Sequence, residues 1–242
     1  MNNADGQPEA PAPRLLITAG PTHEPIDAVR FLGNRSSGAL GLALAADADR
    51  RRWPRTLLLG PTNLPPPRDP PPHPGNRADT TAPLFRFRTT ADLDALLAEH
   101  LHRCDILIMA AAVADYRPAQ TTNTDRKLRR TPGPMTLELE PTPDLLARCA
   151  GRRAPGQLLV GFALEPEGEL HVSARRKLER KGVDAIVANP LETMDAATIT
   201  ATLYHAGRPD PEPAPAGLSK ADFAPWLLDR LHARWLAGRP AA

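Results

Sequence analysis

The chain has 242 residues, of which 41% are hydrophobic, and this suits one α/β domain with long loops better than two domains. A formal net charge of +2 and the lack of a long basic run argue against nucleic-acid binding. No apolar stretch approaches the roughly 20 residues of a membrane span, so we expect a cytoplasmic protein without membrane contact.

The first part of the chain predicts a leader, a strand and a helix. Residues 1–13 are polar and rich in Pro and Ala, and we expect a disordered leader before a single domain over 14–242. The run RLLITAG at 14–20 is typical of a buried strand that stops at glycine. An irregular segment should follow over 21–35, ahead of an Ala/Leu-rich helix that opens at 36–38.

A second strand and a second helix are expected next. TLLLG at 56–60 predicts another buried strand. Prolines cluster over 61–83, which we interpret as a surface loop. LFRFRT at 84–89 alternates like a strand, and Thr90 should cap the helix that follows it.

The strongest strand pattern is DILIMAAA at 105–112, and it leads into a polar excursion. The excursion spans 117–135 and contains the basic run DRKLRR. MTLELE at 135–140 alternates with a period of two, so it should pair with the excursion and complete a flap over about 117–140. Thr142 is expected to cap the next helix, with Pro143 in its first turn.

The last third of the chain continues the alternation of strands and helices. QLLVGFAL at 157–164 and DAIVAN at 184–189 predict buried strands on either side of a charged helix over about 169–181. TITATLYH at 198–205 should add an edge strand. The final helix carries large apolar side chains at helical spacing, which indicate core or a subunit contact: Phe223, Trp226, Leu227, Leu231 and Trp235.

The cysteines are two in number and have no motif around them. Cys104 and Cys149 lie outside any CxxC or Cys/His spacing, so neither a structural zinc nor a disulfide framework is expected. We predict two buried thiols in a reducing compartment.

The alternation of strands and helices predicts a three-layer α/β fold. We expect a Rossmann-like, mostly parallel sheet with helices on both faces, plus the flap excursion. Ligands of such sheets gather beyond the carboxyl ends of the strands. Unusual residues follow four predicted strands, at 18–20, 110–115, 161–165 and 187–189, and they should line one crevice.

The segment after the first strand lacks the GxGxxG dinucleotide fingerprint, and about fifteen residues separate Gly20 from the helix start. A helix N-terminus among small residues still attracts an anion, although an ordinary capped helix fits these residues equally well. Two side chains precede it: Asn34 can hydrogen-bond an acyl oxygen, and Arg30 can hold a phosphate bidentately. Taken singly, both residues are more often structural.

The order of several motifs resembles one enzyme family. The runs ITAGPTHEPIDAVRFLGNRSSGALG, AAAVADYRP, DRKLRR, TPD, VGFALE and DAIVAN are similar to phosphopantothenoylcysteine synthetases, as found in the second half of bacterial bifunctional coenzyme A biosynthesis proteins. The resemblance covers about residues 14–205. No flavin-binding decarboxylase half precedes the motifs, so we expect a free-standing synthetase.

The resemblance implies a ligase with two steps. The carboxylate of 4'-phosphopantothenate attacks the α-phosphate of CTP to give an acyl-cytidylate and pyrophosphate, and the amine of L-cysteine then displaces CMP. CTP is preferred to the alternative, ATP, because AAAVADY and KLRR resemble the bacterial branch of the family. Mg²⁺ is implied as a cofactor, with no protein ligand assigned to it. A homodimer is implied, in which the flap of one subunit closes over the site of the other. A separate flavin decarboxylase is a further expected partner.

The resemblance also implies roles for individual residues. Asn34 should stabilise the acyl-cytidylate with Arg30 nearby, and Lys127 on the flap should neutralise charge as pyrophosphate leaves. Nucleotide contacts are implied for small residues, strand ends, a helix start and three lysines: Gly20, Ser36, Ser37, Gly38, Met109, Ala110, Ala111, Asp115, Lys127, Pro143, Asp144, Leu145, Leu146, Phe162, Lys177 and Lys181. From the residues alone, Lys127 belongs to a solvated charge run, Phe162 to the core, and the last two lysines to a solvated helix face.

The sequence departs from the family pattern in two places. The basic KxKK stretch of the family reads Lys127-Leu128-Arg129-Arg130, which keeps charge but not lysine geometry. Pro21 replaces a common second glycine. Two other functions remain open: a nicotinamide-dependent oxidoreductase, for which no YxxxK pair is present, and a non-catalytic nucleotide-binding descendant.

Overall fold

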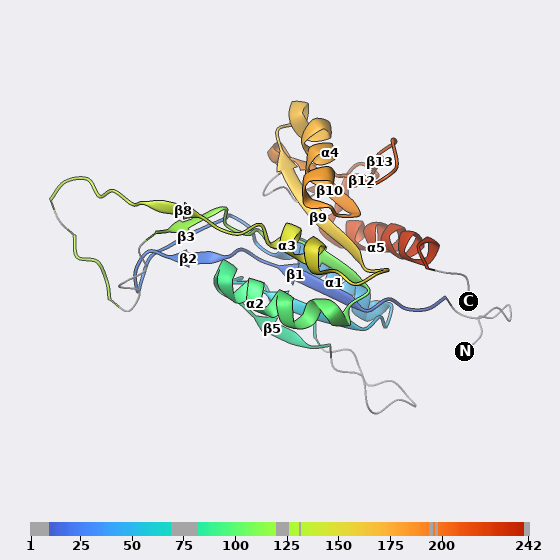
Figure 1. Cartoon of the computed structure of the whole chain (residues 1–242), viewed down its shortest axis with the longest axis horizontal. Coiled ribbons are helices and arrows are strands. Elements are labelled where there is room, and N and C mark those ends of the chain that lie inside the picture. The colour runs from blue at the N-terminus through green and yellow to red at the C-terminus, as the bar shows by residue number, and fades with distance from the viewer. Residues whose placement is uncertain are drawn as a thin grey trace.

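An eight-stranded sheet crosses the protein in the order β13-β12-β10-β9-β6-β1-β4-β5 (Figure 1). The computed structural model describes residues 10–68, 82–119, 126–130, 132–193, 196 and 198–239. The strands of the sheet are β1 (Leu15–Ala19), β4 (Arg55–Leu59), β5 (Leu84–Arg86), β6 (Ile106–Met109), β9 (Leu158–Glu165), β10 (Ala185–Pro190), β12 (Thr202–His205) and β13 (Glu212–Pro213). The six strands from β5 to β10 in the sheet are parallel, so the predicted mostly parallel sheet is confirmed.

The far side of the sheet is antiparallel. β12 runs antiparallel to β10, and β13 pairs antiparallel with β12. The prediction of an edge strand over 198–205 is therefore wrong in two respects. Its first part is the separate strand β11 (Thr198–Ile199), which pairs with β14 (Leu218–Ser219), and β13 covers the remaining part as the true edge.

Helices cover both faces of the sheet, as predicted. α1 (Ala39–Arg50) and α5 (Lys220–Ala237) contribute to one core cluster, and α2 (Thr90–His100), α3 (Leu145–Arg152) and α4 (Leu170–Lys181) contribute to the other. Single turns of 3₁₀ helix occur as η1 (Leu101–Arg103), η2 (Glu167–Glu169) and η3 (Leu191–Thr193). The apolar stripe of the final helix is core: Phe223, Trp226, Leu227, Leu231 and Trp235 all lie in the first cluster.

The parallel strands are apolar at consecutive positions because both of their faces are buried. In β1, Leu15 and Ile17 pack beneath α1 and α5, whereas Leu16 packs beneath α2 and α3. Cys104 and Cys149 are buried and free, as predicted. Burial raises the pKa of the Cys104 thiol to about 12 and that of Cys149 to about 11. No helix in the described ranges is long and apolar enough to cross a membrane.

Two antiparallel hairpins extend away from the sheet, on the left of Figure 1. β2 (His23–Pro25) pairs with β3 (Phe31–Gly33), so the prediction of an irregular segment over 21–35 is wrong. β7 (Tyr116–Pro118) pairs with β8 (Leu139–Pro141), which places paired arms at the base of the predicted flap. The alternating run from Met135 becomes a strand only at Leu139. The predicted flap also includes residues 120–125 and 131, which lie outside the described residues.

Two helix starts lie one and two residues from their predicted positions. Thr89, rather than Thr90, caps α2: its hydroxyl accepts from the Asp92 N–H at 3.1 Å, and the Asp92 carboxylate accepts from the Thr89 N–H at 2.8 Å. Asp144, rather than Thr142, caps α3 by accepting from the Ala147 N–H at 3.1 Å. The hydroxyl of Thr142 instead donates to the Ala114 carbonyl.

Replacing Thr89 with Ala tests the observed capping box. The Asp92 N–H would lose its acceptor, so we expect the free energy of unfolding in urea to fall by about 1 kcal/mol. Thr89→Ser keeps the hydroxyl and should stay within about 0.5 kcal/mol of the unmodified protein. Equal stability of the Ala and Ser variants would contradict the capping role.

Candidate functional site

The carboxyl ends of β1 and β6 are joined by hydrogen bonds. The Ala111 N–H donates to the buried Thr18 hydroxyl at 3.0 Å, and the Ala112 N–H donates to the Gly20 carbonyl at 3.0 Å. The Thr22 N–H returns a bond to the Ala112 carbonyl at 3.1 Å. Two of the segments predicted to line one crevice, 18–20 and 110–115, are therefore neighbours.

The N-terminus of α1 lies directly against this junction. Gly20 and Gly38 both have positive φ, 84° and 77°, and a Cβ on Gly38 would lie 3.2 Å from the Gly20 Cα. Such an approach requires glycine at both positions. Gly38 occupies the N-cap of α1 without a side-chain cap, so the helix presents backbone N–H groups and the positive end of its dipole. This end of α1 is suited to an anion.

The two serines beside this helix start make local contacts. The Gly38 N–H donates to the Ser36 hydroxyl at 3.3 Å, and the Ala39 N–H donates to the Ser37 hydroxyl at 3.4 Å. The Ser37 carbonyl also accepts from the Thr62 hydroxyl at 2.7 Å. These contacts hold the loop in place ahead of α1, while the hydroxyl of Ser37 stays at the exposed surface.

Asn34 reaches the same junction from the end of β3. Its side-chain Nδ2 donates to the Val113 carbonyl at 3.1 Å, across 79 positions of sequence, and the residue remains exposed. The side-chain oxygen of Asn34 has no hydrogen-bond donor among the described residues. The amide is thus anchored through its nitrogen, and its oxygen is left available to a ligand.

Arg30 lies at the opposite end of β3 from Asn34. Asn34 is four steps of extended chain beyond Arg30, which corresponds to roughly 13 Å. The Arg30 guanidinium donates to the Asp27 carboxylate through Nε at 3.0 Å and Nη2 at 2.5 Å, and to the Leu128 carbonyl at 3.3 Å. Within one chain, Arg30 is therefore a neighbour of the flap residues, and Asn34 is a neighbour of the strand-end crevice.

Lys127 lies in the described flap segment 126–130 next to the Arg30 turn. The Ala28 N–H donates to the Arg126 carbonyl at 3.4 Å, and the Leu128 N–H donates to the Asp27 carboxylate at 3.0 Å. Lys127 itself is exposed, and no carboxylate of the described ranges forms an ion pair with it. The chain fixes the backbone on both sides of Lys127 and leaves its ammonium group available.

The start of α3 and the far half of α4 meet through charged pairs. The Lys181 ammonium donates to both oxygens of Asp144, at 2.7 and 2.6 Å, and Lys177 donates to Glu165 at 2.5 Å. Burial acts to raise the pKa of Asp144, but the hydrogen bonds from Lys181 and the Ala147 N–H outweigh it and lower that pKa. A bound triphosphate would therefore have to share Lys177 and Lys181 with these carboxylates, or displace the carboxylates from them.

The remaining predicted nucleotide contacts divide by burial. Leu145 and Leu146 turn their side chains into the core, where Leu146 packs over Gly161, so only their backbone is open to a ligand. Met109 is also core, whereas Ala110, Ala111, Pro143 and Phe162 are half-buried. Asp115 is exposed, and its carbonyl accepts from the Thr142 N–H at 2.9 Å.

The residues fit a metal ion that is carried by phosphates. No group of three or more His, Cys, Asp or Glu side chains in the described ranges forms a metal cage. Mg²⁺ is commonly held by one or two carboxylates together with substrate phosphates, and the exposed Asp115 carboxylate beside the crevice meets that requirement.

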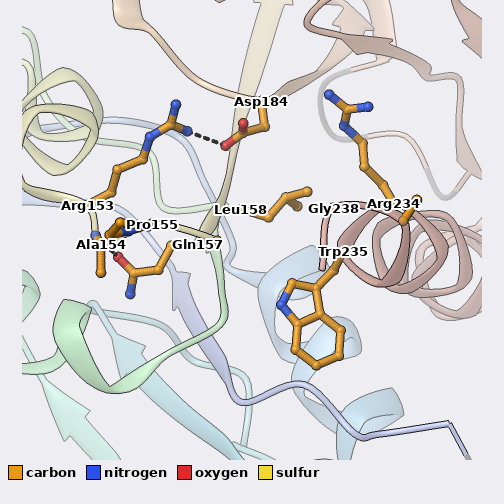
Figure 2. Close-up of a pocket in the computed structure, with 11 residues that line it drawn as sticks. Arg153, Ala154, Pro155, Gln157, Leu158, Asp184, Arg234, Trp235 and Gly238 are labelled. Atoms are coloured by element: carbon orange, nitrogen blue, oxygen red, sulfur yellow. Dashed lines mark hydrogen bonds and ion pairs between the residues drawn. The ribbon is translucent and has the colours of Figure 1, made fainter. Parts of the chain in front are cut away.

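A cavity of about 500 Å³ lies at the other edge of the sheet (Figure 2). It is bounded by the loop before β9, by Asp184 before β10 and by the end of α5, and it contains none of the predicted site residues. Arg153 and Asp184 form an ion pair at 2.6 Å on its wall. Ligands of parallel sheets bind at the carboxyl ends of the strands, so we place the functional site at the β1–β6 junction instead.

Asp27 and Val113 contact the candidate site residues, and the sequence analysis did not single them out. Asp27 binds Arg30 and the flap, and Val113 provides the carbonyl that anchors Asn34. The Asp-x-x-Arg spacing of 27–30 is a signal for a local ion pair in a turn. A backbone carbonyl has no sequence signal of its own.

The fold and the candidate site together define a Rossmann-like α/β protein in which a helix begins against the carboxyl ends of the parallel strands. The family described as the DNA/pantothenate metabolism flavoprotein C-terminal domain matches residues 12–234. The chain belongs to this family, which confirms the resemblance noted from its motifs.

Several relatives support this assignment. The coenzyme A biosynthesis bifunctional protein CoaBC of Mycobacterium tuberculosis is 40% identical over 185 residues, and that of Bacillus subtilis is 38% identical over 182 residues. These matches cover 73% and 75% of this chain and 41% of each relative. A cysteine/cysteine sulfinic acid decarboxylase of an unknown prokaryotic organism is 41% identical over 179 residues, covering 74% of this chain and 46% of that protein. The chain spans less than half the length of these curated relatives.

Solved structures show the same fold. The C-terminal domain of a coenzyme A biosynthesis bifunctional protein CoaBC superposes with a TM-score of 0.73 at 31% identity, covering 93% of this chain and 96% of that one. The DNA/pantothenate metabolism flavoprotein of Streptococcus pneumoniae gives a TM-score of 0.74 at 25% identity, covering 92% and 100%.

Proposed function

We propose that the chain joins 4'-phosphopantothenate to L-cysteine through an acyl-cytidylate, as a ligase of coenzyme A biosynthesis. The observation that carries the proposal is the Asn34–Val113 hydrogen bond, because it brings the end of the β2–β3 hairpin to the carboxyl ends of β1 and β6, where α1 begins. Relatives named for coenzyme A biosynthesis match most of this chain, and one of the similar solved structures is the C-terminal domain of such a protein.

In the first step, a carboxylate oxygen of phosphopantothenate attacks the α-phosphorus of CTP. A new O–P bond forms, and the bond to the β-phosphate breaks to release pyrophosphate. Mg²⁺ would supply charge neutralisation on the phosphates, and the exposed Asp115 carboxylate would help to hold it. The protein's own contribution is positive charge near the leaving group: the N-terminus of α1 in one subunit, and the exposed Lys127 supplied by the flap of the second subunit, stabilise the negative charge that develops there.

In the second step, the amine of cysteine attacks the acyl carbon of the cytidylate. An amide bond forms, CMP leaves, and the ammonium formed on nitrogen loses a proton. Asn34 holds the acyl-cytidylate during this exchange, because its nitrogen is anchored on Val113 while its oxygen is open to the crevice. The neutral amide tolerates the nearby phosphate, which a carboxylate at this position would repel.

We further propose that the protein acts as a homodimer in the cytoplasm. The hairpins and the flap expose several large apolar side chains, which favours burial against a second subunit: Val29 60%, Phe31 45%, Tyr116 53%, Met135 58% and Leu139 45% exposed. Two free, buried thiols are compatible with a reducing compartment. Association with a separate flavin decarboxylase stays a prediction.

The nicotinamide-dependent alternative is not favoured. A dinucleotide requires a glycine-rich turn that leads from the first strand directly into a helix. Here the β2–β3 hairpin separates β1 from α1.

Pyrophosphate release by the purified protein tests the proposal. The protein would be given Mg²⁺, 4'-phosphopantothenate and either CTP or ATP, with and without cysteine. We expect release with CTP that requires phosphopantothenate, and formation of 4'-phosphopantothenoylcysteine once cysteine is added. Release with ATP but not with CTP would show that ATP is the co-substrate. No release with either nucleotide would contradict the proposed ligase activity.

A further inference from the structure

The Asp27 carboxylate is saturated with hydrogen bonds inside the turn between β2 and β3. Its side chain is 0% exposed. Oδ1 accepts from the Val29 N–H at 2.9 Å and the Arg30 N–H at 2.7 Å. Oδ2 accepts from Arg30 Nε at 3.0 Å, from Arg30 Nη2 at 2.5 Å and from the Leu128 N–H at 3.0 Å. One oxygen therefore builds the local turn, and the other joins the turn to the flap.

The contact with the flap reaches across 101 positions of sequence. Two further bonds accompany it: the Ala28 N–H donates to the Arg126 carbonyl at 3.4 Å, and Arg30 Nη2 donates to the Leu128 carbonyl at 3.3 Å. The three bonds hold the backbone immediately before and immediately after Lys127. The side chain of Lys127 makes none of them and stays exposed.

Charge explains why a carboxylate is needed at this position. The flap segment 126–130 carries four basic side chains, and the turn adds the guanidinium of Arg30. Like charges brought this close repel one another, and the buried Asp27 carboxylate lies between the two groups. The hydrogen bonds from Arg30, together with those from backbone N–H groups, also hold the pKa of Asp27 far below its usual range, so the carboxylate stays ionised.

We propose that Asp27 is a positioning residue, which docks the flap segment 126–130 on the Arg30 turn of the same chain and thereby sets the place from which Lys127 offers its charge. The docking is a property of the chain itself. Only its consequence for catalysis rests on the proposed ligase activity.

Asp27→Asn separates the two roles of the carboxylate. The amide oxygen of Asn can still accept from the Val29 and Arg30 N–H groups, so the turn is preserved. The amide nitrogen is a donor, and it would face the guanidinium of Arg30 and the Leu128 N–H, which are donors too. Asp47→Asn is the matched control, because that carboxylate is also nearly buried and bound to two arginines, Arg50 and Arg51, but lies in α1.

Limited trypsin digestion of the full chain, with mass spectrometry of the products, measures the docking without any substrate. Trypsin cuts after the basic residues of 126–130, and the cutting rate follows the population of the undocked segment. We expect Asp27→Asn to raise cleavage at these positions roughly tenfold, the effect of losing one to two charge-assisted hydrogen bonds, while Asp47→Asn leaves it unchanged. An unchanged rate in Asp27→Asn, with melting temperatures of both variants matched, would overturn the proposal.

A double-mutant cycle with Lys127→Gln tests the consequence for catalysis. We expect Asp27→Asn to slow pyrophosphate release about tenfold in the unmodified chain and by less than about twofold in the Lys127→Gln chain, because Asp27 acts through Lys127. A general structural defect would slow both chains equally, and that result would overturn the positioning role. If the unmodified protein releases no pyrophosphate, the proposed function fails, whereas the trypsin digestion still decides the docking.

Discussion

Replacing Lys127 with Gln is expected to slow pyrophosphate release roughly 100- to 1,000-fold, the usual cost of removing one group that stabilises charge in a transition state. The side chain is exposed, and its backbone is held on both sides by the Arg30 turn. Gln keeps similar length and polarity but removes the positive charge that the departing pyrophosphate requires. Single-turnover release of pyrophosphate from CTP would measure the effect on the first step alone.

Arg129→Gln provides the control for Lys127. It removes one positive charge from the same exposed segment, at a position whose geometry departs from the lysine of the family pattern. We expect a loss of less than about fivefold, because the effect of a solvated charge at a distance is screened. Equal losses in the two variants would show that the segment acts through its net charge and would remove the specific role of Lys127.

Replacing Asn34 with Asp should let the acyl-cytidylate form and then stall. A carboxylate beside the bound phosphate adds like-charge repulsion, which we expect to lower overall turnover about 100-fold, or ~2.7 kcal/mol of transition-state stabilisation. Asn34 Nδ2 also loses its bond to the Val113 carbonyl in this variant. The reaction would be quenched before cysteine is added, and acyl-cytidylate would be measured by mass spectrometry. We expect an amount of intermediate about equal to the amount of enzyme.

Asn34→Ala separates the effect of charge from the loss of the anchor. Both variants lose the bond to Val113, but only Asp introduces a negative charge. We therefore expect Ala to slow both steps by similar factors, and Asp to slow the second step much more than the first. Full turnover of Asn34→Asp would contradict the role of Asn34 in the site.

The main architecture could be predicted from the sequence because its signals are local. The parallel strands inside the sheet are short, largely apolar runs buried on both faces, and the stripe of Phe223 to Trp235 repeats at helical spacing. The predicted starts of α2 and α3 were off by one and two residues. Thr89 and Thr90 are both threonines with cap chemistry, and what decides between them is a buried contact: Thr90 donates its hydroxyl and its N–H to Glu24, 66 positions away.

The hairpin over 23–33 could not be predicted from the pattern of its residues. Its strands are three residues long, and they carry no sustained alternation. What stabilises them is tertiary: Thr22 and Glu24 are buried against α2, and Asp27 is buried against the flap. Short strands of this kind form because distant groups satisfy their polar atoms.

The sequence by itself determined the parallel sheet and the two helical layers, and it supplied the candidate residues of the site. The hydrophobic pattern of a strand or a helix is visible within a few neighbouring residues, so it can be recognised in one sequence. Only the tertiary structure decided which of those residues meet. Asn34 lies on the crevice through Val113, while Arg30 lies with Lys127 through Asp27 at the far end of the same hairpin. These pairings join segments 79 to 101 positions apart through buried or backbone hydrogen-bond partners, and such partners leave no mark on local sequence patterns.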